Sequence, residues 1–190
     1  MKNKISYLAL TVSSAVLFAF ATQAAEDLRN ESQQAIANFK KADSSLPTFF
    51  SESAGYAVFP NVGKGGLIVG GAHGKGLVYE KNQVIGQTSM TQASIGAQAG
   101  GQSFAEVIFF ETSAALNDFK AGKFEMSADV SAVAAAEGAS RAAKYKKGVA
   151  VFTLPKKGLM VQASVGGQKF KFEPEPLQPT GRTTPPKSNE

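Results

Sequence analysis

The chain has 190 residues, which is enough for one domain with appendages and a hydrophobic core. It contains no cysteine, and this excludes disulfides, thiol catalysis and thiolate metal sites. A formal net charge of +5 does not indicate nucleic-acid binding unless the basic residues cluster on one face.

The first 24 residues have the pattern of a secretory signal peptide. Lys2 and Lys4 precede an apolar run over residues 5–21, and Thr22 and Ala24 are the small residues of a cleavage site. The alternative is a membrane anchor, but the run is near the lower length limit for a span and is interrupted by hydroxyl residues. Cleavage would leave 18 basic and 15 acidic side chains, a net charge of +3. We therefore expect a periplasmic protein with residues 1–24 removed.

Two helices are predicted to lead the exported chain. Residues 26–42 predict an amphipathic helix, because their apolar side chains fall on one stripe at helical spacing. The stripe consists of Leu28, Ala35, Ile36 and Phe39. A second, short helix is expected from Pro47 to just before Gly55, with Phe49 and Phe50 on its buried side.

A glycine-rich stretch from Gly55 to Gly76 then changes the character of the chain. It predicts short strands joined by glycine turns, with the first strand ended by Pro60 and a turn at residues 74–76. The strands expected up to Phe110 cover residues 56–59, 67–72, 77–79, 84–91, 93–99 and 104–110. Glycines inside these strands favour tight bending and close backbone approach, with direct ligand contact as the alternative.

The second half of the chain predicts one more helix between strands. Thr112 is suited to begin this helix and Gly122 to follow its end. Residues 124–136 alternate between apolar and polar side chains, which predicts a strand, and a basic loop follows at 137–147. The last strands are expected at residues 149–154, 159–165 and 169–172.

These elements predict an α+β fold: a strongly bent antiparallel sheet or partial barrel of short strands, with two N-terminal helices and one inserted helix. The domain is expected to cover residues 25–173. Residues 174–190 are rich in proline and polar side chains, and we expect them to form a disordered tail.

Motifs for nucleotide binding and hydrolysis are not matched. A P-loop requires Ser or Thr after Gly-Lys, whereas glycine follows both Lys64 and Lys75, and neither Gly-Lys-Gly segment is completed to a dinucleotide fingerprint. A Ser-His-acid triad would have to use His73, the single histidine, and no Gly-x-Ser-x-Gly elbow is present. We therefore predict no catalytic residue, no metal site and no cofactor.

Basic residues form the candidate binding site. They occur in two groups along the sequence: Lys64, His73 and Lys75, and then Lys144, Lys146 and Lys147. If the turns that carry them lie at one end of the sheet, the cations and the backbone N–H groups freed at glycine turns could bind an anion such as a lipid head group. The alternative is that they are ordinary solvated turn residues.

Four segments of the chain, in order, carry a family resemblance. They are AGYAVFPNVGKGGLIVGGAHGKGLVY (54–79), AQAGGQSFAEVIFF (97–110), FKAGKFEMSADVSAVAA (119–135) and YKKGVAVFTLPKKGLMVQASVGG (145–167). Together they resemble the SYLF domain family, over about residues 30–172. The resemblance implies a lipid-binding module, since eukaryotic members are associated with phosphoinositide membranes and some fungal members with actin. It also implies membrane contact by the helix near Leu28 to Phe39 and by Lys64.

The sequence thus predicts a non-catalytic module that binds an anionic lipid or a membrane surface after export to the periplasm, and that binds no nucleic acid. The alternative is a structural or interaction protein of the envelope that binds a protein partner. Acids near the start of the leading helix weaken a purely electrostatic role for that helix: Glu26, Asp27 and Glu31. Actin binding is not expected of an exported chain.

Overall fold

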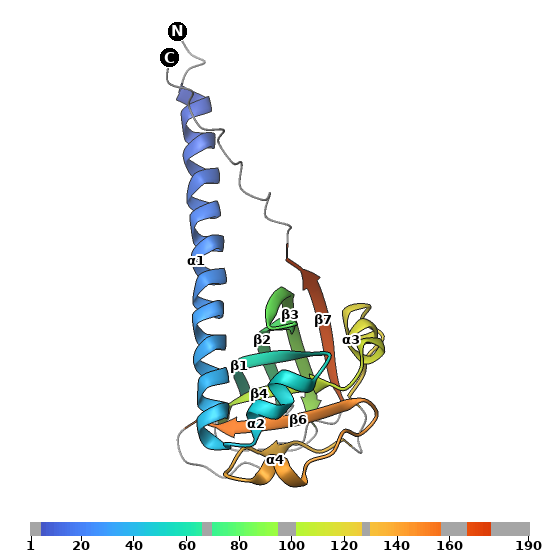
Figure 1. Cartoon of the computed structure of the whole chain (residues 1–190). Coiled ribbons are helices and arrows are strands. Elements are labelled where there is room, and N and C mark those ends of the chain that lie inside the picture. Colours follow the sequence, from blue (N-terminus) through green and yellow to red (C-terminus); the bar gives the residue numbers. More distant parts are fainter. Residues whose placement is uncertain (1–4, 66–69, 95–101, 127–129, 157–166, 176–190) are drawn as a thin grey trace, which may run out of the picture.

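The computed structural model describes residues 5–65, 70–94, 102–126, 130–156 and 167–175. These residues form four helices and one seven-stranded sheet in the order β5-β6-β4-β1-β2-β3-β7 (Figure 1). Neighbouring strands run antiparallel, except that β5 pairs with β6 in parallel. The α+β class with a bent, open sheet is confirmed.

Seven strands form the sheet. They are β1 (Gly55–Gly65), β2 (Gly70–Glu80), β3 (Gln83–Ser94), β4 (Gln102–Phe110), β5 (Val133–Ala134), β6 (Val149–Pro155) and β7 (Gln168–Pro174). The helices are α1 (Ile5–Ala42), α2 (Leu46–Glu52), α3 (Ser113–Lys120) and α4 (Ala139–Ala142).

Helix α1 is longer than the sequence predicted and extends well beyond the sheet toward its N-terminus (Figure 1). Its predicted apolar stripe packs on the sheet: Ala35 and Phe39 are buried, and Leu28 and Ile36 are half-buried against the same core. The stripe therefore holds α1 on the domain. In the part of the chain that the structure describes, no helix is long and apolar enough to cross a membrane.

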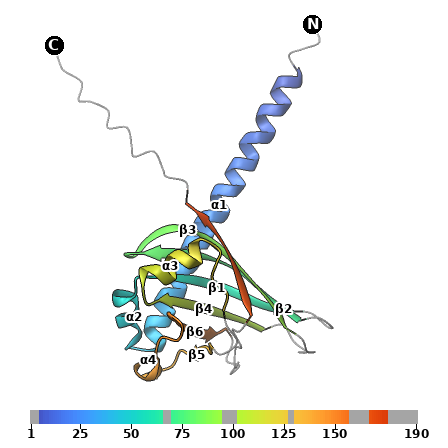
Figure 2. The ribbon, with the colours of Figure 1, turned by 90° about the vertical axis from the view of Figure 1, so that its right-hand side faces the viewer.

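The sheet has a hydrophobic core on each face. One core lies under α1 and α2 and includes Phe39, Phe50 and Phe109, while the other lies under α3 and includes Phe59 and Phe119. Figure 2 shows α3 in front of the sheet and α1 behind it. Because successive residues of a strand point to opposite faces, β1 and β4 supply apolar side chains to both cores.

The predicted boundaries of α3 are confirmed. The Thr112 side chain accepts a hydrogen bond from the backbone N–H of Ala115 at 3.2 Å, as an N-cap does. Gly122 follows the helix with a φ of 67°, a conformation that glycine adopts without steric cost.

Two predicted interruptions are wrong, because β1 continues through Pro60 and β2 through residues 74–76. Pro60 lies where the pairing of β1 shifts register, a position that needs no ladder N–H. Gly76 leaves room for a ring, since a Cβ there would lie 2.8 Å from Cδ1 of Phe59 and closer still to a backbone oxygen. The glycines of β2 thus allow close approach within a strand, which was the favoured structural interpretation.

The predicted strand over residues 124–136 is also wrong. Among its described residues, 124–126 and 130–136, only Val133 and Ala134 form a strand, and Glu125 makes a single bridge to Lys169. Phe124, Met126 and Val130 pack into the core under α3 instead. Helix α4 forms within the expected loop at 137–147. The strand predicted at 159–165 and the tail at 176–190 lie outside the described residues.

Candidate functional site

Part of the sheet carries polar side chains on the face that α1 only partly covers. Lys75 on β2 is paired with Ser89 on β3, which is in turn paired with Lys171 on β7. His73 and Thr91 begin the next row. Cross-strand partners point to the same face, so these side chains project together. The alternate residues, such as Met90, point into the core under α3.

His73, Lys75 and Lys171 are all exposed, and we call them the cationic face. They line one hollow of about 350 Å³, together with Ser89 and Glu173. Two strand spacings separate β2 from β7, which places the Cα atoms of Lys75 and Lys171 about 10 Å apart. Both ammonium groups can therefore reach one anion that lies over β3.

Glu173 is the acid of this hollow. Its Oε1 lies 2.7 Å from Nζ of Lys171. The hydrogen bond and charge of Lys171, and then the charge of Lys75, lower the pKa of Glu173, and Glu173 raises the pKa of Lys171. The next lysine along β7, Lys169, is paired with Glu125 at 3.8 Å.

A second hollow, of about 440 Å³, continues from the cationic face beneath α1. His73 and Lys75 form its sheet side, and Asp27, Leu28 and Glu31 of α1 form its other side. The hollow therefore has a basic wall on the sheet and an acidic wall on the helix.

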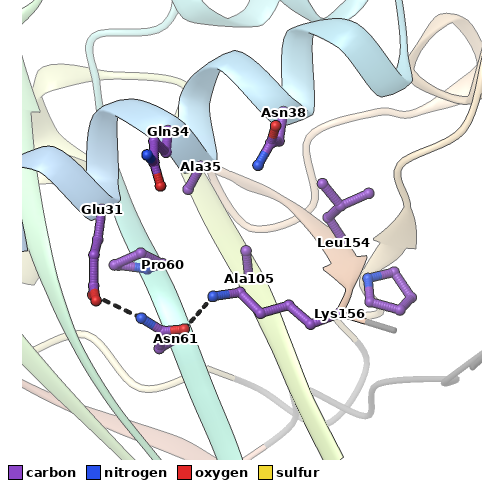
Figure 3. A pocket seen from close by; sticks show the side chains of 10 residues that line it. Glu31, Gln34, Ala35, Asn38, Pro60, Asn61, Ala105, Leu154 and Lys156 are labelled. Atoms are coloured by element: carbon purple, nitrogen blue, oxygen red, sulfur yellow. Dashed lines mark hydrogen bonds between the residues drawn. The ribbon is translucent and has the colours of Figure 1, made fainter. Parts of the chain in front are cut away.

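A third hollow, of about 420 Å³, lies farther along α1 between the helix and β1 and β6. Figure 3 shows Glu31 reaching from α1 toward Asn61, whose Nδ2 donates to Glu31 Oε2 at 2.7 Å and whose Oδ1 accepts a hydrogen bond from Lys156. Arg29 of α1 forms an ion pair with Glu175 just after β7. These polar contacts fasten α1 at both sides of the cationic face.

The structure brings together only part of the predicted site. His73 and Lys75 are neighbours on β2, whereas Lys144, Lys146 and Lys147 lie just before β6, with β4 and β1 between the two groups in the sheet order. Lys144 and Lys146 line a separate hollow of about 300 Å³ beside β6. Lys64 belongs to β1, opposite Ala72, and its side chain lies outside the described part of the chain. The basic residues thus form two patches.

Sequence reasoning missed Lys171 and Glu173. The signal was present in the alternation of residues 168–174, QKFKFEP, where lysines and phenylalanines must occupy opposite faces of a strand. Phe170 and Phe172 pack against the core under α3, so the charged side chains face outward.

Three aromatic residues of α1 and α2, Phe39, Phe49 and Phe50, are core residues. Phe39 is fully buried, Phe50 is 5% exposed, and the ring of Phe49 lies 5.4 Å from that of Phe109. None of them can enter a lipid layer while α1 and α2 stay on the sheet.

The buried acids are engaged within the protein. Oε2 of Glu106 accepts a hydrogen bond from Nε2 of Gln168 at 3.0 Å. Asp43 accepts hydrogen bonds from Ser45 and Ser140. Among the residues that the structure describes, no group of three or more histidine or acidic residues could hold a metal ion.

Two comparisons with known proteins confirm the family resemblance. Residues 91–175 match the family model described as "Ysc84: Las17-binding protein actin regulator". The chain is also 32% identical, over 127 residues, to Beta cell expansion factor A of Aeromonas veronii. The aligned stretch covers 66% of this chain and 48% of that protein. The chain therefore spans about half the length of this curated relative. The family match includes Lys171 and Glu173 but begins after His73 and Lys75.

Proposed function

This chain belongs to the SYLF (Ysc84) family, and we propose that it is a non-catalytic module that binds anionic phospholipid head groups in the periplasm. The description of the family is that of a binding and regulatory protein. The observation that carries the proposal is the cationic face, where Lys75 and Lys171 lie on either side of β3 and line one hollow.

The geometry suits a phosphate group better than an acyl chain. The cationic face is polar and exposed, and hydroxyl side chains such as Ser89 lie between the cations and can donate hydrogen bonds to phosphate oxygens. The phenylalanines of β7 point into the opposite core. We infer that the head group binds on the surface of the sheet while the acyl chains stay in the bilayer.

The second basic patch has a separate role in the proposal. Lys144, Lys146 and Lys147 are exposed, so they add attraction to an anionic surface without sharing the same phosphate. Each lysine near an anionic bilayer contributes about 1 kcal/mol, which falls with salt. Lys64, near the end of β1, is retained as a candidate contact because the family resemblance implies that it touches the membrane.

Co-sedimentation with vesicles tests this function. Purified protein is mixed with phosphatidylcholine vesicles, with or without phosphatidylglycerol, at low and at physiological salt. We expect binding that requires phosphatidylglycerol and weakens as salt increases. Equal binding to both vesicle types would exclude an anionic head-group site.

A protein partner is the alternative function. It is favoured by the description of the family as Las17-binding, which names a protein ligand for family members. The hollow beside β6 would suit such a partner, because apolar residues such as Val149 and Val151 line it and Lys144 and Lys146 lie there too. A stoichiometric partner recovered from the envelope, and lost on substitution of Lys144 and Lys146, would support this role.

A further inference from the structure

The carboxylate of Glu173 occupies the place where the proposed ligand would meet the cationic face. Glu173 is paired with Gln87 on β3 and lies one side-chain step along β7 from Lys171, on the same face. It lines the same hollow as Lys75 and Lys171, and its Oε1 is 2.7 Å from the Lys171 ammonium. The chain thus supplies its own anion to the site.

We propose that Glu173 is a built-in counter-ion that competes with the ligand phosphate for Lys171 and Lys75. This inference rests on the proposed function and describes how that site is regulated. Without a ligand, the carboxylate neutralises one lysine of the pair. When a phosphate binds, its oxygens replace the carboxylate at Lys171, and Glu173 turns toward solvent. The contact is exposed, so this exchange does not require any change in the sheet.

The electrostatics support competition at both lysines. Lys171 and Lys75 each lower the pKa of Glu173, so both cations stabilise its negative charge. A phosphate that binds to the two lysines must therefore compensate for the favourable interaction that they make with the Glu173 carboxylate. Glu173 therefore reduces the affinity of the site and limits binding to surfaces of sufficient negative charge.

The chain offers a closely matched control. Glu125 pairs with Lys169 on the same strand, and both ion pairs have side chains that are more than 60% exposed. Neither Glu125 nor Lys169 lines the hollow of the cationic face. Glu173→Gln and Glu125→Gln change the net charge equally, but only the first removes the anion from the site.

The experiment measures partitioning onto vesicles of equimolar phosphatidylcholine and phosphatidylglycerol for the wild type and both variants. Glu173→Gln is expected to raise the affinity about fivefold, because it releases Lys171 for the phosphate and so adds the contribution of one lysine at an anionic surface. Glu125→Gln is expected to stay within about twofold of the wild type, because its charge lies outside the site. In a Lys171→Ala background, the gain in affinity from Glu173→Gln should be smaller, because the lysine that Glu173 occupies is absent. Far-ultraviolet circular dichroism checks that each variant is folded.

The outcomes separate the two proposals. If the wild type binds and Glu173→Gln gains no more than Glu125→Gln, the counter-ion is wrong and the head-group site stands. If the wild type does not bind but Glu173→Gln does, the counter-ion is supported in its strongest form. If neither protein binds, both the site and its counter-ion are refuted.

Discussion

Replacing Asp43 with alanine should destabilise the domain strongly for a change to a single acidic residue. The Asp43 side chain is fully buried between the end of α1 and the start of α4. Oδ1 accepts hydrogen bonds from Ser45 N at 2.9 Å, Ser45 Oγ at 2.6 Å and Gly138 N at 3.2 Å. Oδ2 accepts from the backbone N–H of Ser140 at 2.7 Å. This one carboxylate therefore joins the turn between α1 and α2 to α4.

The size of the effect follows from the burial of these donors. Ser140 is 3% exposed, so its N–H would lose its acceptor without access to water, which costs about 1–3 kcal/mol. The donors of Ser45 and Gly138 are half-buried and can partly return to solvent. We expect the free energy of unfolding to fall by about 3 kcal/mol, which lowers Tm by about 6–12 °C for a domain of this size.

Urea unfolding followed by far-ultraviolet circular dichroism measures this loss, with Ser44→Ala as the control. The Ser44 hydroxyl donates to Glu137 in the same junction, but this contact is exposed, so its removal should destabilise the domain much less than the loss of Asp43 does. A loss below about 1 kcal/mol for Asp43→Ala would refute the claim that this carboxylate fastens α4.

The pH dependence gives an independent check. Burial alone would raise the pKa of Asp43, but the hydrogen bonds from Ser45 and Ser140 outweigh it and hold the pKa well below the ordinary value of 3.8. A lowered folded-state pKa stabilises the protein above the unfolded-state pKa, and this stabilisation is lost as the pH falls through and below 3.8. The difference between the wild type and Asp43→Ala should therefore narrow as the solution is acidified below that pH.

Two further predictions concern the sheet and the N-terminus. Gly76→Ala should lower the free energy of unfolding by about 1–3 kcal/mol, because a Cβ there overlaps the Phe59 ring and a backbone oxygen. The control is Gly63→Ala, which should be tolerated because a Cβ at Gly63 meets nothing within 4 Å. Equal stability of the two variants in thermal unfolding would contradict this packing. Intact mass spectrometry of the protein recovered from the periplasm should show a chain that begins at Ala25, and retention of residues 1–24 would exclude cleavage after Ala24.

Local rules predicted α2, α3 and the C-terminal half of α1, because their signals are short-range, but they did not predict α4. The apolar stripe around Phe39 and the capping residues Thr112 and Gly122 each depend on neighbours within a few positions. The strands were harder, because glycine has two uses that look alike in sequence. Gly76 reads as a turn but lies in β2, where the missing Cβ admits the ring of Phe59 from the neighbouring strand.

The candidate site could be predicted only in part for a related reason. His73 and Lys75 are two residues apart on one strand, so their common face follows from strand geometry. Lys171 is 96 positions farther along than Lys75, and its place beside the same hollow depends on β7 pairing with β3. No local pattern specifies that pairing. The strand order, which places β4 and β1 between β6 and β2, cannot be read from local patterns either, and Lys144 was therefore predicted to share a binding site with Lys75.

The central claim is that Lys75 and Lys171 together bind an anionic head group. The direct measurement is the affinity of the Lys75→Ala, Lys171→Ala double variant for equimolar phosphatidylcholine–phosphatidylglycerol vesicles. It is compared with the affinity of the wild type and of a control, Lys123→Ala, which removes an exposed lysine after α3. We predict about a thirtyfold loss for the double variant, from two charges of about 1 kcal/mol each, and a much smaller loss for Lys123→Ala. A double variant that binds as well as Lys123→Ala would show that the cationic face is not the site.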